Sequence, residues 1–200
     1  MSRSSSYQPF DEITDGDQPK IELKWEYLTY TASTYNSKTK QTTQTELLHS
    51  TSGIARPGDF VAIMGPSGAG KTTLMNILSQ KIRSSDTTSV GGCVYANGTP
   101  ISDLVYTNYI AYVTQEDILL DTMSVREAIT FSVKLRTGLD RNKIEEKVNK
   151  ILKELSLVDV QNSLIGSVLI RGISGGEKKR VCIAVEIVTD PSVLFLDGNT

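Results

Sequence analysis

The stretch GPSGAGKTT, residues 65–73, decides how the rest of this sequence is interpreted. It fits the pattern G-x-x-x-x-G-K-[ST], and it stands between the apolar run DFVAIM at 59–64 and a segment with apolar residues at helical spacing. Glycines let a backbone wrap closely and point successive N–H groups at phosphate oxygens, and the N-terminus of the next helix favours an anion. We therefore predict a buried strand, a phosphate-binding loop and a helix in succession.

The loop residues have separate expected roles in holding a nucleoside triphosphate. The Lys71 ammonium can reach the β- and γ-phosphates, the Thr72 hydroxyl can ligate Mg²⁺, and Thr73 would hold the α-phosphate end. A dinucleotide pattern, G-x-G-x-x-G, is excluded because no third glycine follows Gly68-Ala69-Gly70 at the required distance. The predicted phosphate-binding set is Gly65, Pro66, Ser67, Gly68, Ala69, Gly70, Lys71, Thr72 and Thr73.

A second apolar run, VLFL at 193–196, ends in Asp197. Four apolar residues predict a buried strand, and a carboxylate at its end is more often a helix cap or a turn residue. In phosphate-binding-loop proteins, however, a neighbouring strand ends in an aspartate that holds Mg²⁺. Together with the loop at 65–73, Asp197 is therefore interpreted as that magnesium-holding residue.

Strands alternate with helices along the chain, which favours an α/β domain with a mostly parallel sheet. We also expect an antiparallel β region on the N-terminal side, a helical subdomain at about 116–172, and a disordered tail at 1–20 ahead of a nucleotide-binding domain at 21–200. The expected strands are 21–30, 59–64, 91–96, 109–115 and 193–196, and the third of them ends in an Asn97-Gly98 turn. The expected helices are 71–83, a helix that starts with a capping box at Ser124, 141–155 and 175–189. Residues 31–45 are expected to form an extended loop.

The composition of the chain indicates which partners and which compartment to expect. A net charge of −2 and a pI near 5.5 give no reason to expect nucleic acid as a partner. The N-terminus has no apolar core that would make a signal peptide. The sequence contains no run of 18 or more apolar residues, so no membrane span is predicted. Cys93 and Cys182 lie far apart in apolar stretches, so two free thiols in a reducing compartment are expected.

The segment IRGISGGEKKRVCIAVEIVTDPSVLFLD, residues 170–197, resembles the signature region of ATP-binding-cassette (ABC) ATPases, with ISGGE in place of LSGGQ. The sequences of residues 55–81 and 113–136 are similar to those of the G (White) subfamily of half-transporters. This resemblance covers about residues 21–197. It implies the ABC type of P-loop NTPase fold, with ATP and Mg²⁺ as cofactors.

The resemblance also implies partners and residue roles. Two cassettes would pack head to tail, so that the signature residues act in trans on ATP held by the other chain, at the cytoplasmic face of a membrane and beside a transmembrane domain. Gln115 would be the catalytic-site glutamine, and Tyr30, or else Tyr27 or Tyr35, would stack on adenine. The implied signature set is Ser174, Gly175, Gly176 and Glu177, and the implied metal set is Thr72, Gln115 and Asp197.

One departure from the family pattern concerns hydrolysis. Gly198 and Asn199 follow Asp197 where the family has Glu-Pro, and the switch histidine is absent, because no histidine follows His49. Losing a positioned general base costs on the order of 10²- to 10⁴-fold in rate, so we expect little hydrolysis. Two explanations stay open: a cassette truncated after Asp197, or a short protein that binds nucleotide without turnover and contributes its signature motif to an intact cassette.

Overall fold

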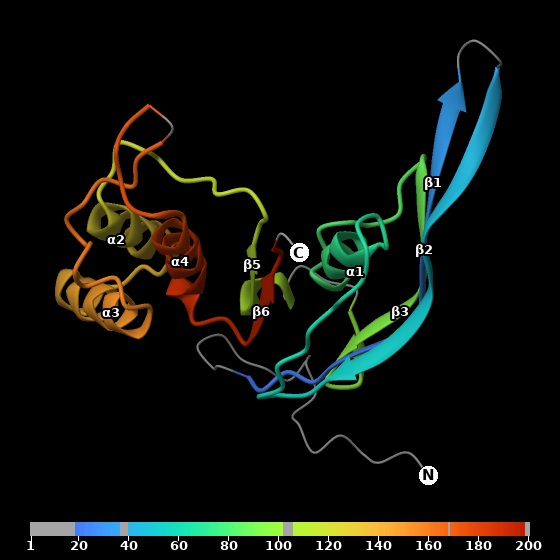
Figure 1. Cartoon of the computed structure of the whole chain (residues 1–200). Coiled ribbons are helices and arrows are strands. Elements are labelled where there is room, and N and C mark those ends of the chain that lie inside the picture. Colours follow the sequence, from blue (N-terminus) through green and yellow to red (C-terminus); the bar gives the residue numbers. More distant parts are fainter. Residues whose placement is uncertain (1–18, 37–39, 102–105, 168, 199–200) are drawn as a thin grey trace. The chain divides into compact units, whose positions relative to one another are not determined.

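The computed structural model describes residues 19–36, 40–101, 106–167 and 169–198. The chain divides into two compact units, Met1–Ile110 (together with Thr200) and Ala111–Asn199, and each is described by itself. Figure 1 shows the elements of both units along the sequence. The predicted tail at 1–20 lies almost wholly outside the described residues.

The first unit is built on a four-stranded antiparallel sheet with the order β2-β1-β3-β4. Its strands are β1 (Leu23–Asn36), β2 (Gln41–Ala55), β3 (Thr88–Ala96) and β4 (Thr99–Pro100). The predicted antiparallel region on the N-terminal side is therefore confirmed, as is the strand expected at 21–30.

The extended loop expected at 31–45 is wrong, because β1 and β2 continue through this stretch as a two-stranded ribbon (Figure 1). The pairing register runs on from Ala32 opposite Thr45 to Asn36 opposite Gln41, past the last pair between β1 and β3. Threonine has a high β propensity, but both faces of this part of β2 are exposed. Without a buried face there is no apolar alternation, so the sequence pattern gave no strand signal here.

The turn predicted at Asn97-Gly98 is confirmed, with φ of 49° and 82° at the two residues. The Asn97 side chain is buried, accepts a hydrogen bond from the Glu22 N–H at 2.7 Å and donates one to the Lys20 carbonyl at 3.1 Å. The β3–β4 turn thereby fixes the chain just ahead of β1.

The strand expected at 59–64 is absent, and these residues, all of them described, form no regular element. Phe60 and Met64 are 90% and 85% exposed. A parallel strand obtains its hydrogen bonds and its cover only from neighbouring strands and helices. The apolar run shows that the segment is suited to burial, but it does not supply the partners.

The helix after the loop, α1 (Lys71–Leu78), is shorter than the predicted 71–83. Gln80 adopts a left-handed conformation with φ of 60°, and the N–H groups of Lys81 and Ile82 both donate to the Asn76 carbonyl, which closes the helix end. The buried face of α1 consists of Leu74, Met75, Ile77 and Leu78.

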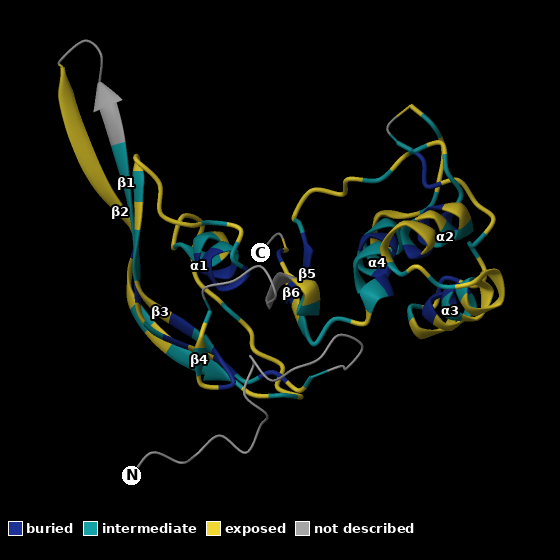
Figure 2. Cartoon of the chain, turned by 180° about the vertical axis from the view of Figure 1, so that it is seen from behind, coloured by how far each residue is buried: buried dark blue, intermediate teal, exposed yellow. Residues whose placement is uncertain are grey.

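The second unit holds a helical body formed by α2 (Val125–Arg136), α3 (Arg141–Glu154), α4 (Gly175–Glu186) and the short η3 (Ile187–Thr189). Figure 2 shows the buried residues on the inner sides of these helices. The core draws on all of these elements, so it extends past residue 172 into α4 and η3; its most deeply buried members are Val125, Ile129, Val133, Leu157, Val181, Ala184 and Val188.

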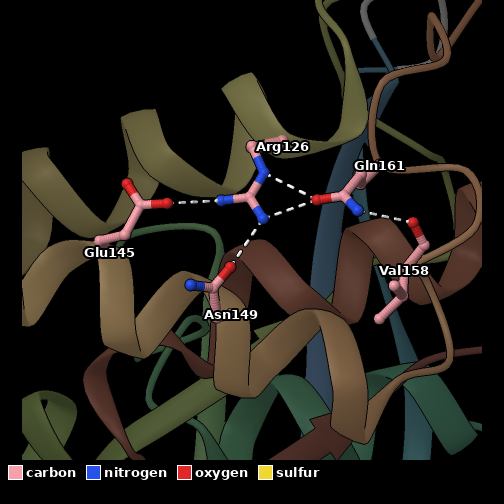
Figure 3. Close-up of polar contacts among 5 residues, drawn as sticks. All are labelled: Arg126, Glu145, Asn149, Val158 and Gln161. Atoms are coloured by element: carbon pink, nitrogen blue, oxygen red, sulfur yellow. Dashed lines mark hydrogen bonds and ion pairs between the residues drawn. The ribbon is translucent and has the colours of Figure 1, made fainter.

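Arg126 ties the parts of this body together, as Figure 3 shows. Its guanidinium donates to the Gln161 side-chain oxygen at 2.8 and 2.6 Å, to Asn149 at 2.6 Å and to Glu145 at 3.2 Å. Gln161 in turn donates to the Val158 carbonyl at 2.9 Å. One side chain on α2 thus joins α3 and the loop that follows it.

The second unit also contains a two-stranded sheet of β5 (Ile110–Val113), apart from its first residue, and β6 (Val193–Leu196). Both strands were predicted from the sequence, within 109–115 and at 193–196. They bring Gln115 and Asp197, which lie far apart in the sequence, to the ends of neighbouring strands.

Candidate functional site

The loop at 65–70 is closed on itself by the side chain of Lys71. The Lys71 ammonium donates to the Gly65 carbonyl at 2.8 Å and to the Pro66 carbonyl at 2.9 Å. The Ala69 N–H donates to the Pro66 carbonyl at 3.2 Å and forms a turn inside the loop. The ammonium therefore lies across the loop, beside the backbone that the sequence predicts to surround phosphates.

Gly70 is the residue at which the loop passes into α1, and its φ is 86°. A Cβ atom at this position would lie 3.0 Å from the Leu47 carbonyl oxygen and 3.2 Å from the Leu48 Cδ1. Both the left-handed conformation and the close approach to β2 therefore require glycine here.

The first turn of α1 is electrostatically suited to an anion. Gly70 offers no side chain to cap the helix, and the first turn carries no acidic residue. The first N–H groups of a helix have no partner inside the helix, and the aligned peptide dipoles add partial positive charge there. This helix start can bind phosphate oxygens.

Asp197 is held at the end of β6 in the second unit. Its carboxylate is buried and accepts a hydrogen bond from the Tyr112 hydroxyl at 3.1 Å, and its N–H donates to the Val113 carbonyl at 2.9 Å. The Tyr112 ring stacks on Phe195, with centroids 6.0 Å apart. Burial, followed by the charge of Asp197 and the hydrogen bond to it, raises the pKa of Tyr112, so the phenol remains a donor to the carboxylate.

The predicted signature residues form the start of α4. Ser174 is the N-cap of a capping box: its N–H and hydroxyl donate to Glu177 Oε2 at 2.8 and 2.7 Å, and the Glu177 N–H donates back to the serine oxygen. Hydrogen bonds from the Ser174 side chain and backbone hold the pKa of Glu177 below its ordinary value.

The two glycines that follow are open to an incoming group. A Cβ at Gly175 would meet no atom within 4 Å, and one at Gly176 would meet only the Arg180 guanidinium at 3.9 Å. The packing of this chain therefore does not require glycine at either position. Their small size leaves the backbone N–H groups accessible from outside.

Gln115 follows β5, and its backbone is anchored to α4. The Lys179 ammonium donates to the Thr114 carbonyl at 2.8 Å and the Gln115 carbonyl at 3.2 Å, and contacts Asp117 Oδ1 at 3.4 Å. The Cys182 thiol donates to the same Asp117 oxygen at 3.3 Å. Burial and this hydrogen-bonded carboxylate raise the pKa of Cys182 to about 12, so the thiol stays protonated at neutral pH.

The tyrosines considered for adenine lie on β1. Tyr30 is half-buried, opposite Leu48 on β2 and Val90 on β3. Tyr27 is 73% exposed at a bulge where φ is 52°. The Tyr35 side chain lies outside the described part of the chain. Stacking on adenine stays a prediction for all three.

The predicted site residues thus fall on both units. The phosphate loop and Tyr30 belong to the first unit, whereas Gln115, Asp197 and the signature residues belong to the second. Sequence reasoning missed Lys179 and Tyr112, the two side chains that hold the predicted residues of the second unit. A lysine in GGEKKR is typical of a solvated helix face, and a tyrosine in YIAYV is typical of strand packing, so neither residue type gave a signal.

Two further observations bear on the setting of the site. Both cysteines are free, Cys93 exposed and Cys182 buried. Among the residues that the structure describes, no helix has the length and apolar character needed to cross a membrane.

A glycine-rich loop closed by a lysine, an uncapped helix start, and a buried aspartate after a strand define a P-loop nucleotide-binding domain, and the ISGGE helix start is typical of the ABC class. A family model described as "ABC transporter" matches residues 48–200. The chain belongs to the ABC transporter family, which confirms both the α/β P-loop fold class and the family predicted from the sequence.

The chain is also similar to named members of the G family. It is 38% identical over 196 residues to ABC transporter G family member 7 of Arabidopsis thaliana, covering 96% of this chain and 26% of that protein. It is 38% identical over 181 residues to the broad substrate specificity ATP-binding cassette transporter ABCG2 of Mus musculus, covering 89% and 27%. The predicted subfamily is confirmed, and the chain spans about a quarter of the length of these relatives.

Proposed function

We propose that this chain is the Mg·ATP-binding module of a transporter of the G family. The observation that carries the proposal is the Lys71-closed loop ahead of an uncapped α1, within a sequence of the ABC family. Binding of ATP would replace the loop carbonyls around the ammonium with β- and γ-phosphate oxygens, which hold a compact ammonium charge more strongly.

Magnesium would be held by few protein groups. Among the described residues, no group of three or more His, Cys, Asp or Glu side chains could hold a metal ion. Mg²⁺ in nucleotide sites keeps several waters and is bound through one or two carboxylates plus phosphate oxygens. Thr72, Gln115 and Asp197 supply a hydroxyl, an amide and a carboxylate, which fits that ligand chemistry.

The test is a titration of the whole chain with ATP in the presence and absence of magnesium. Wild type should bind ATP, and Lys71→Ala should bind at least tenfold more weakly while unfolding at nearly the same temperature, because the lysine ammonium donates to exposed loop carbonyls. Wild-type binding that is undetectable at millimolar ATP would overturn the proposal.

We further propose that two copies associate head to tail, each presenting the Ser174–Gly176 surface to ATP bound by the other. The open space at Gly175 and Gly176 supports this arrangement. Sedimentation should show Mg·ATP-dependent association that Ser174→Arg abolishes. Ser124→Arg, at the matching capping box of α2, is the control and should leave association unchanged. Equal loss in both variants would refute the assignment.

Turnover is expected to be low because Gly198 stands where the family has the glutamate that activates water. Gly198 is exposed, and a Cβ there would meet nothing within 4 Å, so a longer side chain fits without a clash. Gly198→Glu should raise the ATPase rate at least tenfold, and Lys71→Ala should remove the gain. A variant with unchanged turnover would show that position 198 does not limit the rate.

Such a module would act at the cytoplasmic face of a membrane and drive transport through a transmembrane domain. The names of the relatives, all transporters, support this role. Pull-down of the chain with a G-family membrane domain, compared in ATP and ADP, would test the partnership.

A further inference from the structure

We propose that Lys179 is a positioning residue that links the signature helix to Gln115, so that the start of α4 and the magnesium-contacting glutamine move as one body. The inference rests on the proposed function, since it concerns how that site is organised. Neither the family pattern nor the proposed ligands assign a role to this lysine.

The link consists of contacts from one ammonium group to the segment that carries Gln115. Lys179 Nζ donates to two successive carbonyls, those of Thr114 and Gln115, and contacts the Asp117 carboxylate. The Lys179 side chain is 34% exposed and Asp117 30%, so water competes only partly for these groups. A charged donor shared by two carbonyls fixes the backbone of Gln115, and thereby limits where its amide can reach.

A second contact reinforces the first along the same helix face. Cys182 lies three residues beyond Lys179, about one helical turn away, and its thiol donates to the same Asp117 oxygen. Because α4 begins with the capping box at Ser174, both contacts are joined to the signature residues through less than three turns of continuous helix. A shift of the helix start would therefore carry the Gln115 segment with it.

The neighbouring lysine shows that this geometry is specific. Lys178 donates to the Gly166 carbonyl at 3.1 Å and pairs with Asp121 at 3.6 Å, so it holds a different segment. Lys178 and Lys179 carry the same charge on the same helix, and of the two it is Lys179 that contacts the Gln115 backbone. Lys178→Met is therefore a matched control for Lys179→Met.

The first arm of the experiment measures ATP affinity of the whole chain with magnesium and with EDTA. Magnesium should raise the ATP affinity of wild type, and in Lys179→Met this increase should be at least threefold smaller. The affinity of the variant in EDTA should stay within twofold of wild type, because Lys71 and the loop are unaltered. Lys179→Arg, which keeps a charged donor of sufficient reach, should restore most of the gain, and Lys178→Met should retain it.

The second arm measures the alkylation rate of Cys182, with exposed Cys93 as the internal reference. Lys179→Met should raise the Cys182 rate at least fivefold by releasing the segment at 114–117, although loss of the positive charge alone would make the thiol less reactive. Lys178→Met should leave the rate unchanged. A thermal unfolding scan shows whether Lys179→Met is folded. If it is unfolded, the same measurements are made on Lys179→Arg instead.

The outcomes separate the two proposals. If wild type binds ATP through Lys71 but Lys179→Met keeps both the magnesium gain and the Cys182 protection, the link is refuted and the ATP site stands. If wild type binds no ATP while Lys179→Met still exposes Cys182, the proposed function fails and the link has only a structural role.

Discussion

The helices α1 and α4 both begin at residues predicted to meet phosphate, but they begin in different ways. α1 starts from a left-handed glycine with no side-chain cap, and a lysine of its own lies across the loop. α4 starts from a serine whose side chain already accepts the N–H of Glu177. The first start has no side-chain cap, whereas the second satisfies part of its donors through its own serine and depends on two glycines for access.

The start of α2 shows which of these features matters. Ser124 and Glu127 form the same capping box as Ser174 and Glu177. The residues that follow Ser124 are Val125, buried in the helical core, and Arg126, bound to Gln161. A capping box therefore begins a helix in either setting, and the glycine pair is what distinguishes the candidate site from an ordinary start.

The largest expected effect is at Gly70. Gly70→Ala should cost about 1–2 kcal/mol for the left-handed conformation, plus the cost of the close approach to the Leu47 carbonyl, and should weaken ATP binding at least tenfold. Denaturant unfolding and ATP titration measure the two effects.

Gly98→Ala is the matched control for this change. Its φ of 82° gives the same conformational cost, but a Cβ there meets nothing within 4 Å. If both variants lose equal stability and both bind ATP normally, the contact between the loop and β2 has no role.

The next effect compares the two serine caps. Ser174→Ala and Ser124→Ala should each lower the free energy of unfolding by about 1 kcal/mol, because each removes the acceptor at a helix N-cap. Only Ser174→Ala should also weaken Mg·ATP-dependent association, measured by sedimentation. Equal effects on association would assign both serines to folding alone.

A smaller effect of opposite sign is expected at the glycine pair. Gly175→Ala should leave stability unchanged or raise it by up to about 0.5 kcal/mol, because alanine is the better helix former and its Cβ meets open space. The same change should reduce Mg·ATP-dependent association. A variant that is both more stable and fully associated would contradict the role of the pair.

The smallest effect is the pH dependence of the caps. Ser174 and Ser124 hydrogen bonds lower the pKa of Glu177 and Glu127 below their ordinary value of 4.5. A lowered pKa contributes stability that is complete above that value and is lost as pH falls through the folded-state pKa. Glu177→Gln should therefore flatten the acid limb of the unfolding curve, measured between pH 3 and 6 at constant salt, about as much as Glu127→Gln does.

The elements that carry their own local pattern were predictable from the sequence. The capping box at Ser124, the Asn97-Gly98 turn and the helices α2 and α3 depend on residues a few positions apart, and the structure confirms them. The strand expected at 59–64 and the extended loop expected at 31–45 are both wrong, for opposite reasons. Residues 59–64 form an apolar run but pair with no strand, whereas residues 31–36 and 41–45 lie in paired strands but contain no apolar run.

The candidate site follows the same division. The phosphate loop could be recognised from its residue pattern and the signature from its resemblance to the ABC family, because both are continuous stretches. The side chains that hold the site, Lys179 and Tyr112, act on residues about 65 and 85 positions away. No local pattern reports a contact over that separation.

The exposed, irregular segment 59–64 has a practical consequence for anyone handling this polypeptide. An irregular segment with Phe60 and Met64 in solvent is a preferred cleavage point for a protease such as chymotrypsin, and a cut there would break the chain between β2 and the phosphate loop. Limited digestion followed by mass spectrometry would therefore serve as a simple ligand screen, since any nucleotide that orders the loop should slow the appearance of that fragment.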